Sequence, residues 1–213
     1  MENRILIIGD ELLGEQGEAA NRFAEILLCR EANRPVQFSI NAPAPQSLRQ
    51  LLDRASADII GKKAGRIILG LGLKELKRGG TDYNGVFTLY QALAHEILSK
   101  TLATVHFLTV PEDMFPQAPS QVVALNDLLR GLAAQDDKRV RIMDFAAYVA
   151  DFKEKQLERG KFGRSLYTDD GLPTSICNTF LSLFLYSKIY FTHILSKKTS
   201  AVSISADSRR RRL

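Results

Sequence analysis

Charged side chains follow several apolar runs of this sequence, and most of them are carboxylates. The residues that could do chemistry are Asp10, Glu11, Lys74, Glu75 and Asp170, and Pro173 follows closely after the last of them. Two carboxylates can act as general acid and general base on a glycosidic or phosphate ester, and Glu11 with Asp170 is the pair we consider. Four of these residues, Asp10, Glu11, Glu75 and Asp170, could instead bind a hard cation, but Lys74 would oppose it. We therefore expect no metal site.

The other residues suited to catalysis fall within apolar or helical stretches. His95 lies in a predicted helix, His106 in a predicted strand and His193 late in a terminal helix, so we interpret all three as structural. Cys29 and Cys177 have no CxxC or metal-ligand spacing, and we expect each to be a buried free thiol. These patterns predict neither a disulfide framework nor a cofactor.

Apolar runs alternate with stretches of helical spacing along the chain. The predicted strands are 5–8, 36–40 (the weakest), 66–69, 103–110 and 139–143. The predicted helices are 18–30, 47–60, 86–102, 120–134 and a terminal helix from about 173 to 195. Such alternation is typical of an α/β fold, a three-layer α/β/α sandwich around a parallel five-stranded sheet. Ligands of such sheets bind beyond the carboxyl ends of the strands, where the charged residues above are expected.

Three segments at these strand ends carry a family resemblance. They are Gly9-Asp10-Glu11, Gly72-Leu73-Lys74-Glu75 and Asp170-Gly171-Leu172-Pro173. In order and spacing they resemble the Gly-Asp-Ser, Gly-x-Asn-Asp and Asp-x-x-His blocks of the SGNH (GDSL) hydrolases. The resemblance extends over the chain to about Leu195. A generic flavodoxin-like domain with charged loops is the alternative.

The resemblance implies a degenerate active site. The family's serine nucleophile corresponds to Glu11, its oxyanion asparagine to Lys74 and its histidine base to Pro173, while no glycine stands in 41–44 for the second block. We therefore expect a catalytically inactive pseudoenzyme that serves as a binding or scaffolding module for a protein or small-molecule ligand. The alternative is a hydrolase of esters or glycans with a rewired site that uses Glu11 and Asp170. We also expect Glu11 and Lys74 to form an ion pair.

The net charge of +5 resides in the carboxyl-terminal tail. Six basic residues and one acid follow Ser196, so the tail carries +5 and the remainder of the chain is neutral. We predict a domain over 1–195 and a disordered basic tail over 196–213 that could recruit an anionic partner. A neutral body predicts no nucleic-acid binding by the folded domain. The sequence shows no signal-peptide pattern, and Lys188 interrupts the terminal apolar run, so we expect a cytoplasmic protein without a membrane partner.

Overall fold

The computed structural model describes residues 4–14, 17–30, 36–41, 47–77, 83–135, 138–160 and 165–189. Five parallel strands form one sheet in the order β2-β1-β3-β4-β5. The strands are β1 (Arg4–Gly9), β2 (Gln37–Asn41), β3 (Arg66–Gly70), β4 (Thr104–Leu108) and β5 (Val140–Met143). All five coincide with predicted strands to within a few residues at each end, which confirms the parallel five-stranded sheet.

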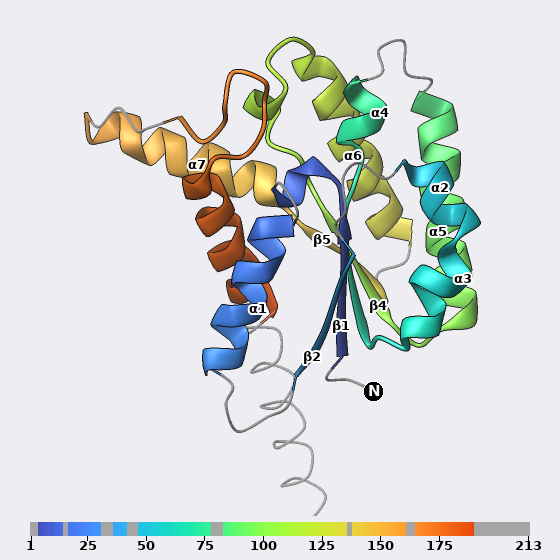
Figure 1. Ribbon diagram of the computed structural model, residues 1–213. Coiled ribbons are helices and arrows are strands. Elements are labelled where there is room, and N and C mark those ends of the chain that lie inside the picture. Colours follow the sequence, from blue (N-terminus) through green and yellow to red (C-terminus); the bar gives the residue numbers. More distant parts are fainter. Residues whose placement is uncertain are drawn as a thin grey trace, which may run out of the picture.

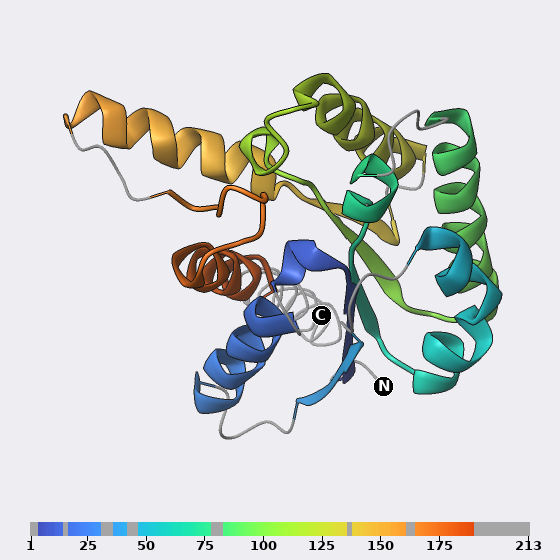
Figure 2. The same ribbon diagram turned by 45° about the horizontal axis from the view of Figure 1, so that its top comes forward.

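Helices cover both faces of this sheet, as Figures 1 and 2 show. One face carries α1 (Glu18–Arg30) and a terminal helix over 175–189. The other carries α2 (Leu48–Asp53), α3 (Ala55–Asp58), α5 (Tyr83–Lys100) and α6 (Pro119–Gln135). The predicted three-layer α/β/α arrangement is therefore confirmed.

The core lies between the sheet and these two helical layers. Leu6, Ile7 and Ile8 of β1 are fully buried, because a central parallel strand is covered on both faces. Phe23 of α1 packs edge-to-face against Phe38 of β2, with ring centroids 5.8 Å apart. The alternation of apolar strands and amphipathic helices thus produces one continuous hydrophobic core.

Several elements differ from the sequence-based prediction. The predicted helix 47–60 is divided at Arg54 into α2 and α3 and is followed by the short 3-10 helix η3 (Ile60–Lys62). Two helices were not predicted, namely α4 (Leu73–Lys77) and α7 (Phe145–Glu158), and α7 projects from the side of the domain (Figure 1). Within the described residues no helix is long and apolar enough to cross a membrane. The predicted tail, 196–213, lies outside the described residues.

Candidate functional site

The carboxyl ends of the strands meet at one edge of the sheet, at the top of Figure 1, and the predicted site residues lie on the segments that begin there. The 3-10 helix η1 (Glu11–Leu13) follows β1, and α4 follows β3. The loop 165–174 and the 3-10 helix η4 (Glu112–Met114) complete this edge. We refer to it as the carboxyl edge.

Asp10 is a buried carboxylate whose oxygens are engaged by backbone N–H groups. One oxygen accepts a hydrogen bond from the amide of Leu12 at 3.1 Å. The other accepts from the amides of Gly72 and Leu73 at 2.9 and 2.8 Å. Asp10 therefore joins the end of β1 to the turn after β3, and with only 4% of its surface exposed it is not presented to a substrate.

The proton affinity of Asp10 is raised by its surroundings. Burial raises the pKa of Asp10 from 3.8 to about 7, and the neighbouring carboxylate of Glu75 adds to this rise. The three backbone N–H groups act in the opposite direction, because they stabilise the ionised form, but they do not outweigh the burial. The floor of this edge thus holds an acid that titrates near neutral pH.

Glu75 and Tyr90 complete the buried polar floor. Glu75 accepts a hydrogen bond at 2.9 Å from the amide of Leu48, the first residue of α2. The Tyr90 hydroxyl donates to the carbonyl of Leu71 at 2.7 Å, and burial, with the nearby Asp10 and Glu75, raises the pKa of Tyr90 well above its ordinary value. These two side chains hold α2 and α5 against the turn after β3, so their role is to position that turn.

Glu11 and Lys74 lie higher on the same edge. Glu11 is the first residue of η1 and Lys74 the second residue of α4, and these two short helices pack against each other. Both side chains are half-buried. The structure therefore places Glu11 and Lys74 on neighbouring elements, and their ion pair stays a prediction.

Asp170 and Pro173 are held by the loop 165–174. The Asp170 side chain is exposed, whereas Pro173 is half-buried and pairs with Tyr167 in an isolated antiparallel bridge. Gly171 between them has φ 74°, and a Cβ there would lie 2.3 Å from the carbonyl oxygen of Met114 in η4. Only glycine fits this close approach, so the Asp-Gly-Leu-Pro segment is anchored to η4.

The four carboxylates considered for a cation do not form a common site. Asp10 and Glu75 are buried among backbone donors, while Asp170 is exposed on its loop. Among the residues that the structure describes, no three His, Cys, Asp or Glu side chains are grouped so that they could hold a metal ion.

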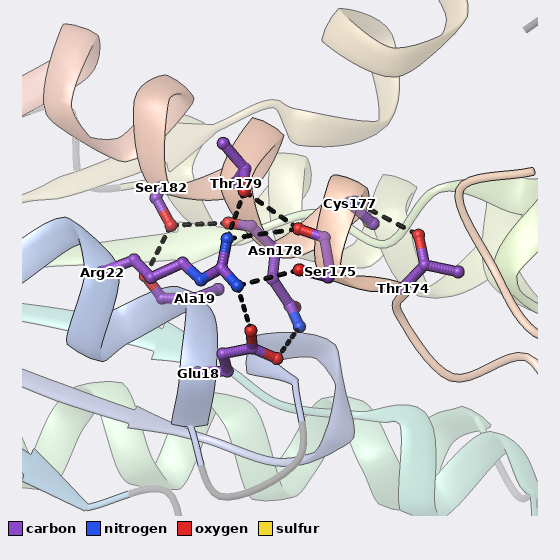
Figure 3. Close-up of polar contacts among 9 residues, drawn as sticks. All are labelled: Glu18, Ala19, Arg22, Thr174, Ser175, Cys177, Asn178, Thr179 and Ser182. Carbon is purple, nitrogen blue, oxygen red and sulfur yellow. Dashed lines mark hydrogen bonds and ion pairs between the residues drawn. The ribbon is translucent and has the colours of Figure 1, made fainter. Parts of the chain in front are cut away.

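A polar cluster that sequence reasoning missed fixes the terminal helix beside this edge (Figure 3). Arg22 of α1 is paired with Glu18 and donates to the Ser175 hydroxyl at 2.9 Å and to the Thr179 hydroxyl. The amide of Asn178 donates to the other oxygen of Glu18 at 2.6 Å. The i, i+4 spacing of Glu18 and Arg22 was the only sequence signal, and it gives no hint of a partner more than 150 residues away.

Neither histidine within the described residues lies at the carboxyl edge. His106 is buried in β4, and burial, followed by the charges of Arg66 and Arg141, lowers the pKa of His106 to about 4. His95 is exposed on α5. It borders a hollow between α5 and α6 that is also lined by Leu98 and Leu132. His193 lies outside the described residues. The expectation that His95 and His106 are not part of the site is consistent with these positions.

The cysteines differ from each other in exposure. Cys177 is buried as expected, and burial raises the pKa of its thiol to about 11 despite the neighbouring Tyr167 and Lys153, so it is protonated at neutral pH. Cys29 is exposed, so the expectation of a buried thiol was wrong there. It lies in the last turn of α1, on the helix side that faces solvent.

Comparison with known proteins relates this chain to hydrolases by fold alone. No protein-family model matches the sequence, and a comparison with curated proteins found no match. Among solved structures, an acetyl xylan esterase has a TM-score of 0.70 at 18% identity over 87% of this chain and 99% of its own. A lipase/acylhydrolase from Enterococcus faecalis has a TM-score of 0.70 at 13% identity, over 89% of this chain and 95% of its own. A GDSL-like lipase from Bacteroides thetaiotaomicron has a TM-score of 0.62 at 15% identity, over 90% of this chain and 89% of its own.

Proposed function

The chain has the SGNH-hydrolase fold, and we propose that it is a catalytically inactive member of that architecture which binds a ligand at the carboxyl edge. The observation that carries this proposal is the chemistry of two positions on that edge. Where the resemblance places the nucleophile and the base, the chain has Glu11 and Pro173, on η1 and on the loop 165–174. Proline has no side-chain base, and a carboxylate is a poor nucleophile toward an ester.

The surroundings of these positions support the loss of ester hydrolysis. An acyl-transfer site needs free N–H donors aimed at the developing oxyanion. The family's asparagine donor corresponds here to Lys74, and the segment 41–44 contains no glycine for the other donor. A negative side chain at position 11 would also repel the oxyanion. The edge thus has the framework of a hydrolase without the asparagine and glycine that hold the oxyanion in the family.

The runner-up is a hydrolase in which Glu11 and Asp170 act as general base and acid. It would use two carboxylates at the carboxyl edge, of which Glu11 is half-buried and Asp170 is exposed. The solved neighbours include an acetyl xylan esterase and a family 3 carbohydrate esterase, so acetylated glycans are the substrates to test.

The experiment measures hydrolysis by the full chain of short p-nitrophenyl esters and of acetylated xylan, together with labelling by a fluorophosphonate probe. We expect no turnover above the buffer background and no labelled serine. Glu11→Gln and Asp170→Asn serve as matched isosteric variants, and circular dichroism checks that each is folded. Turnover that is lost in either variant would overturn the inactive assignment in favour of the rewired enzyme, and stoichiometric labelling would reveal a serine nucleophile.

A further inference from the structure

One buried carboxylate joins the two short helices of the carboxyl edge to the sheet. Asp10 directly follows β1, and its backbone N–H donates to the carbonyl of Gly70 in β3 at 3.0 Å. Its side chain accepts from the amide of Leu12 in η1 and from the amides of Gly72 and Leu73, where α4 begins. Asp10 is therefore fixed to the end of the sheet, and α4 starts on its side chain.

Helix α4 is short and depends on its buried side chains. It lies above the end of β1 in Figure 1 and contains five residues, too few for a helix to be stable without tertiary contacts. The side chains of Leu73 and Leu76 are buried, and Glu75 accepts from the amide of Leu48 in α2 at 2.9 Å. Because α4 is a single turn held by these contacts, it can open without disrupting the sheet.

Two glycines precede α4. Gly70 ends β3, and Gly72 has φ 118°, a conformation that glycine adopts without strain. A Cβ at Gly72 would lie 2.7 Å from Cδ2 of Leu125 in α6 and 3.2 Å from the hydroxyl oxygen of Tyr90 in α5. The turn between β3 and α4 thus fits closely against both helices when α4 is closed, and its glycines supply the backbone freedom of a hinge.

The second buried carboxylate of this edge, Glu75, belongs to α4 itself. Asp10 is fixed to the sheet, whereas Glu75 would move with α4. Burial, and after it the charge of Glu75, raises the pKa of Asp10 to about 7. Burial disfavours each charge, and like charges repel each other. When both side chains are ionised, electrostatics therefore opposes the closed position of α4.

The other titratable side chains described near this seam are Tyr90 of α5, Glu11 of η1 and Lys74 of α4. Burial, and after it the charges of Asp10 and Glu75, raises the pKa of Tyr90 well above its ordinary value, so Tyr90 stays neutral. Glu11 and Lys74 are half-buried and lie higher on the edge. Asp10 and Glu75 are thus the two acids buried in the seam between α4 and the sheet.

From this geometry we propose that α4 is a lid over Asp10, hinged at Gly70 and Gly72, and that loss of the proton from Asp10 opens it. In the closed position a protonated Asp10 places no second charge beside Glu75. Transfer of its proton to water leaves two buried carboxylates, and opening hydrates and separates them. The lid lies at the edge where the proposed function places a ligand, but its test needs no ligand and is independent of that function.

Proton linkage gives the sign and size of the effect. The pKa of Asp10 is about 7 in the closed position and returns toward its ordinary value of 3.8 when α4 opens. Between these pH values each opening releases one proton, so the opening equilibrium constant increases about ten-fold for each pH unit. The increase is about 100-fold from pH 5 to pH 7, and the constant levels off above pH 7.

The test is amide hydrogen exchange of the full chain between pH 5 and pH 8, followed by NMR spectroscopy and corrected for the intrinsic exchange rate. The reporter is the amide of Leu76, which donates to the carbonyl of Gly72 at 3.1 Å. We expect its protection to fall about 100-fold from pH 5 to pH 7 and then to level off. At each pH its protection should be lower than that of Ile7 in β1, because the lid opens while the sheet stays intact.

Three variants assign the effect to the seam. Asp10→Asn has no proton to lose, so the fall in protection of Leu76 should disappear. Glu75→Gln removes the repelling charge, so protection at pH 8 should be higher than in the wild type, and its fall should end at a lower pH. The matched control Glu112→Gln removes an exposed carboxylate on η4 at the same edge and should keep the wild-type pH dependence.

Several outcomes would overturn the lid. Equal protection of Leu76 and Ile7 would mean that α4 opens only when the whole domain unfolds. Protection of Leu76 that is constant or rises with pH would remove the link to proton loss, and a fall that persists in Asp10→Asn would assign it to another group. If Asp10→Asn does not fold, the pH dependence of the wild type and its shift in Glu75→Gln decide the test.

Discussion

Replacing Asp10 with asparagine tests the buried floor of the carboxyl edge. The side chain keeps its size but can no longer ionise. Two opposing effects act on the wild-type carboxylate, because three backbone N–H groups favour its charge while burial and Glu75 disfavour it. The pKa of Asp10 at about 7 means that burial prevails.

The sign of the pH dependence follows from this pKa. Because the folded-state value of about 7 exceeds the ordinary value of 3.8, the folded protein holds the proton more tightly than the unfolded chain between these pH values. Asp10 therefore contributes stability below about pH 4, and this contribution is lost as the pH rises to about 7. At 1.36 kcal/mol for each pH unit, the loss is about 4 kcal/mol.

An asparagine side chain does not titrate, so its contribution to stability does not change with pH. Its amide nitrogen cannot accept a hydrogen bond, so one backbone N–H group would face a donor. This mismatch costs about 1 to 3 kcal/mol at any pH. We expect Asp10→Asn to be less stable than the wild type at pH 4, and the difference to move in favour of asparagine by about 4 kcal/mol by pH 8.

The assay is urea unfolding at a series of pH values, followed by circular dichroism because the sequence has no tryptophan. The measured quantity is the free energy of unfolding of Asp10→Asn minus that of the wild type. A difference that stays constant with pH would refute the raised pKa. A difference that moves in favour of aspartate as the pH rises would show that the three N–H groups prevail over burial.

Three further predictions concern other parts of the chain. In a double-mutant cycle of Glu11→Gln and Lys74→Met, we expect a coupling energy of about 1 kcal/mol because both side chains are half-buried. A coupling energy of zero would show that the two side chains do not interact. Gly171→Ala should lower the free energy of unfolding by at least about 2 kcal/mol, since its Cβ would meet the Met114 carbonyl at 2.3 Å; an unchanged denaturation midpoint would contradict this. Removal of 197–213 should shift the melting temperature by less than about 5 °C, and a larger fall in a thermal melt would show that the tail packs on the domain.

Local pattern was sufficient to predict the fold. The spacing of apolar residues is set by the period of a strand or helix, so β1 and α1 are visible in a short window of sequence. The polar second half of α7 hides its period, although Phe145 and Val149 are buried at helical spacing behind the N-cap Asp144. The five residues of α4 are too few to show a period at all.

The position of the candidate site residues was also predictable, because parallel strands end at the same edge. Glu11, Lys74 and Pro173 lie on segments of that edge, as expected from the order of the three blocks. The state of each side chain was not predictable. Asp10 is bound by amides 62 and 63 residues away, and those distances exist only once β1 and β3 are paired.

The sum of the charges also follows from the sequence, whereas their positions in space follow from the fold. The sequence determines that the chain before its tail is neutral, because a sum of charges does not depend on conformation. The fold alone decides that Arg4, Arg66 and Arg139, which are far apart in the sequence, all lie where strands begin. Electrostatic energy depends on the distances between charges, and the parallel sheet brings residues from distant parts of the sequence to the same edge.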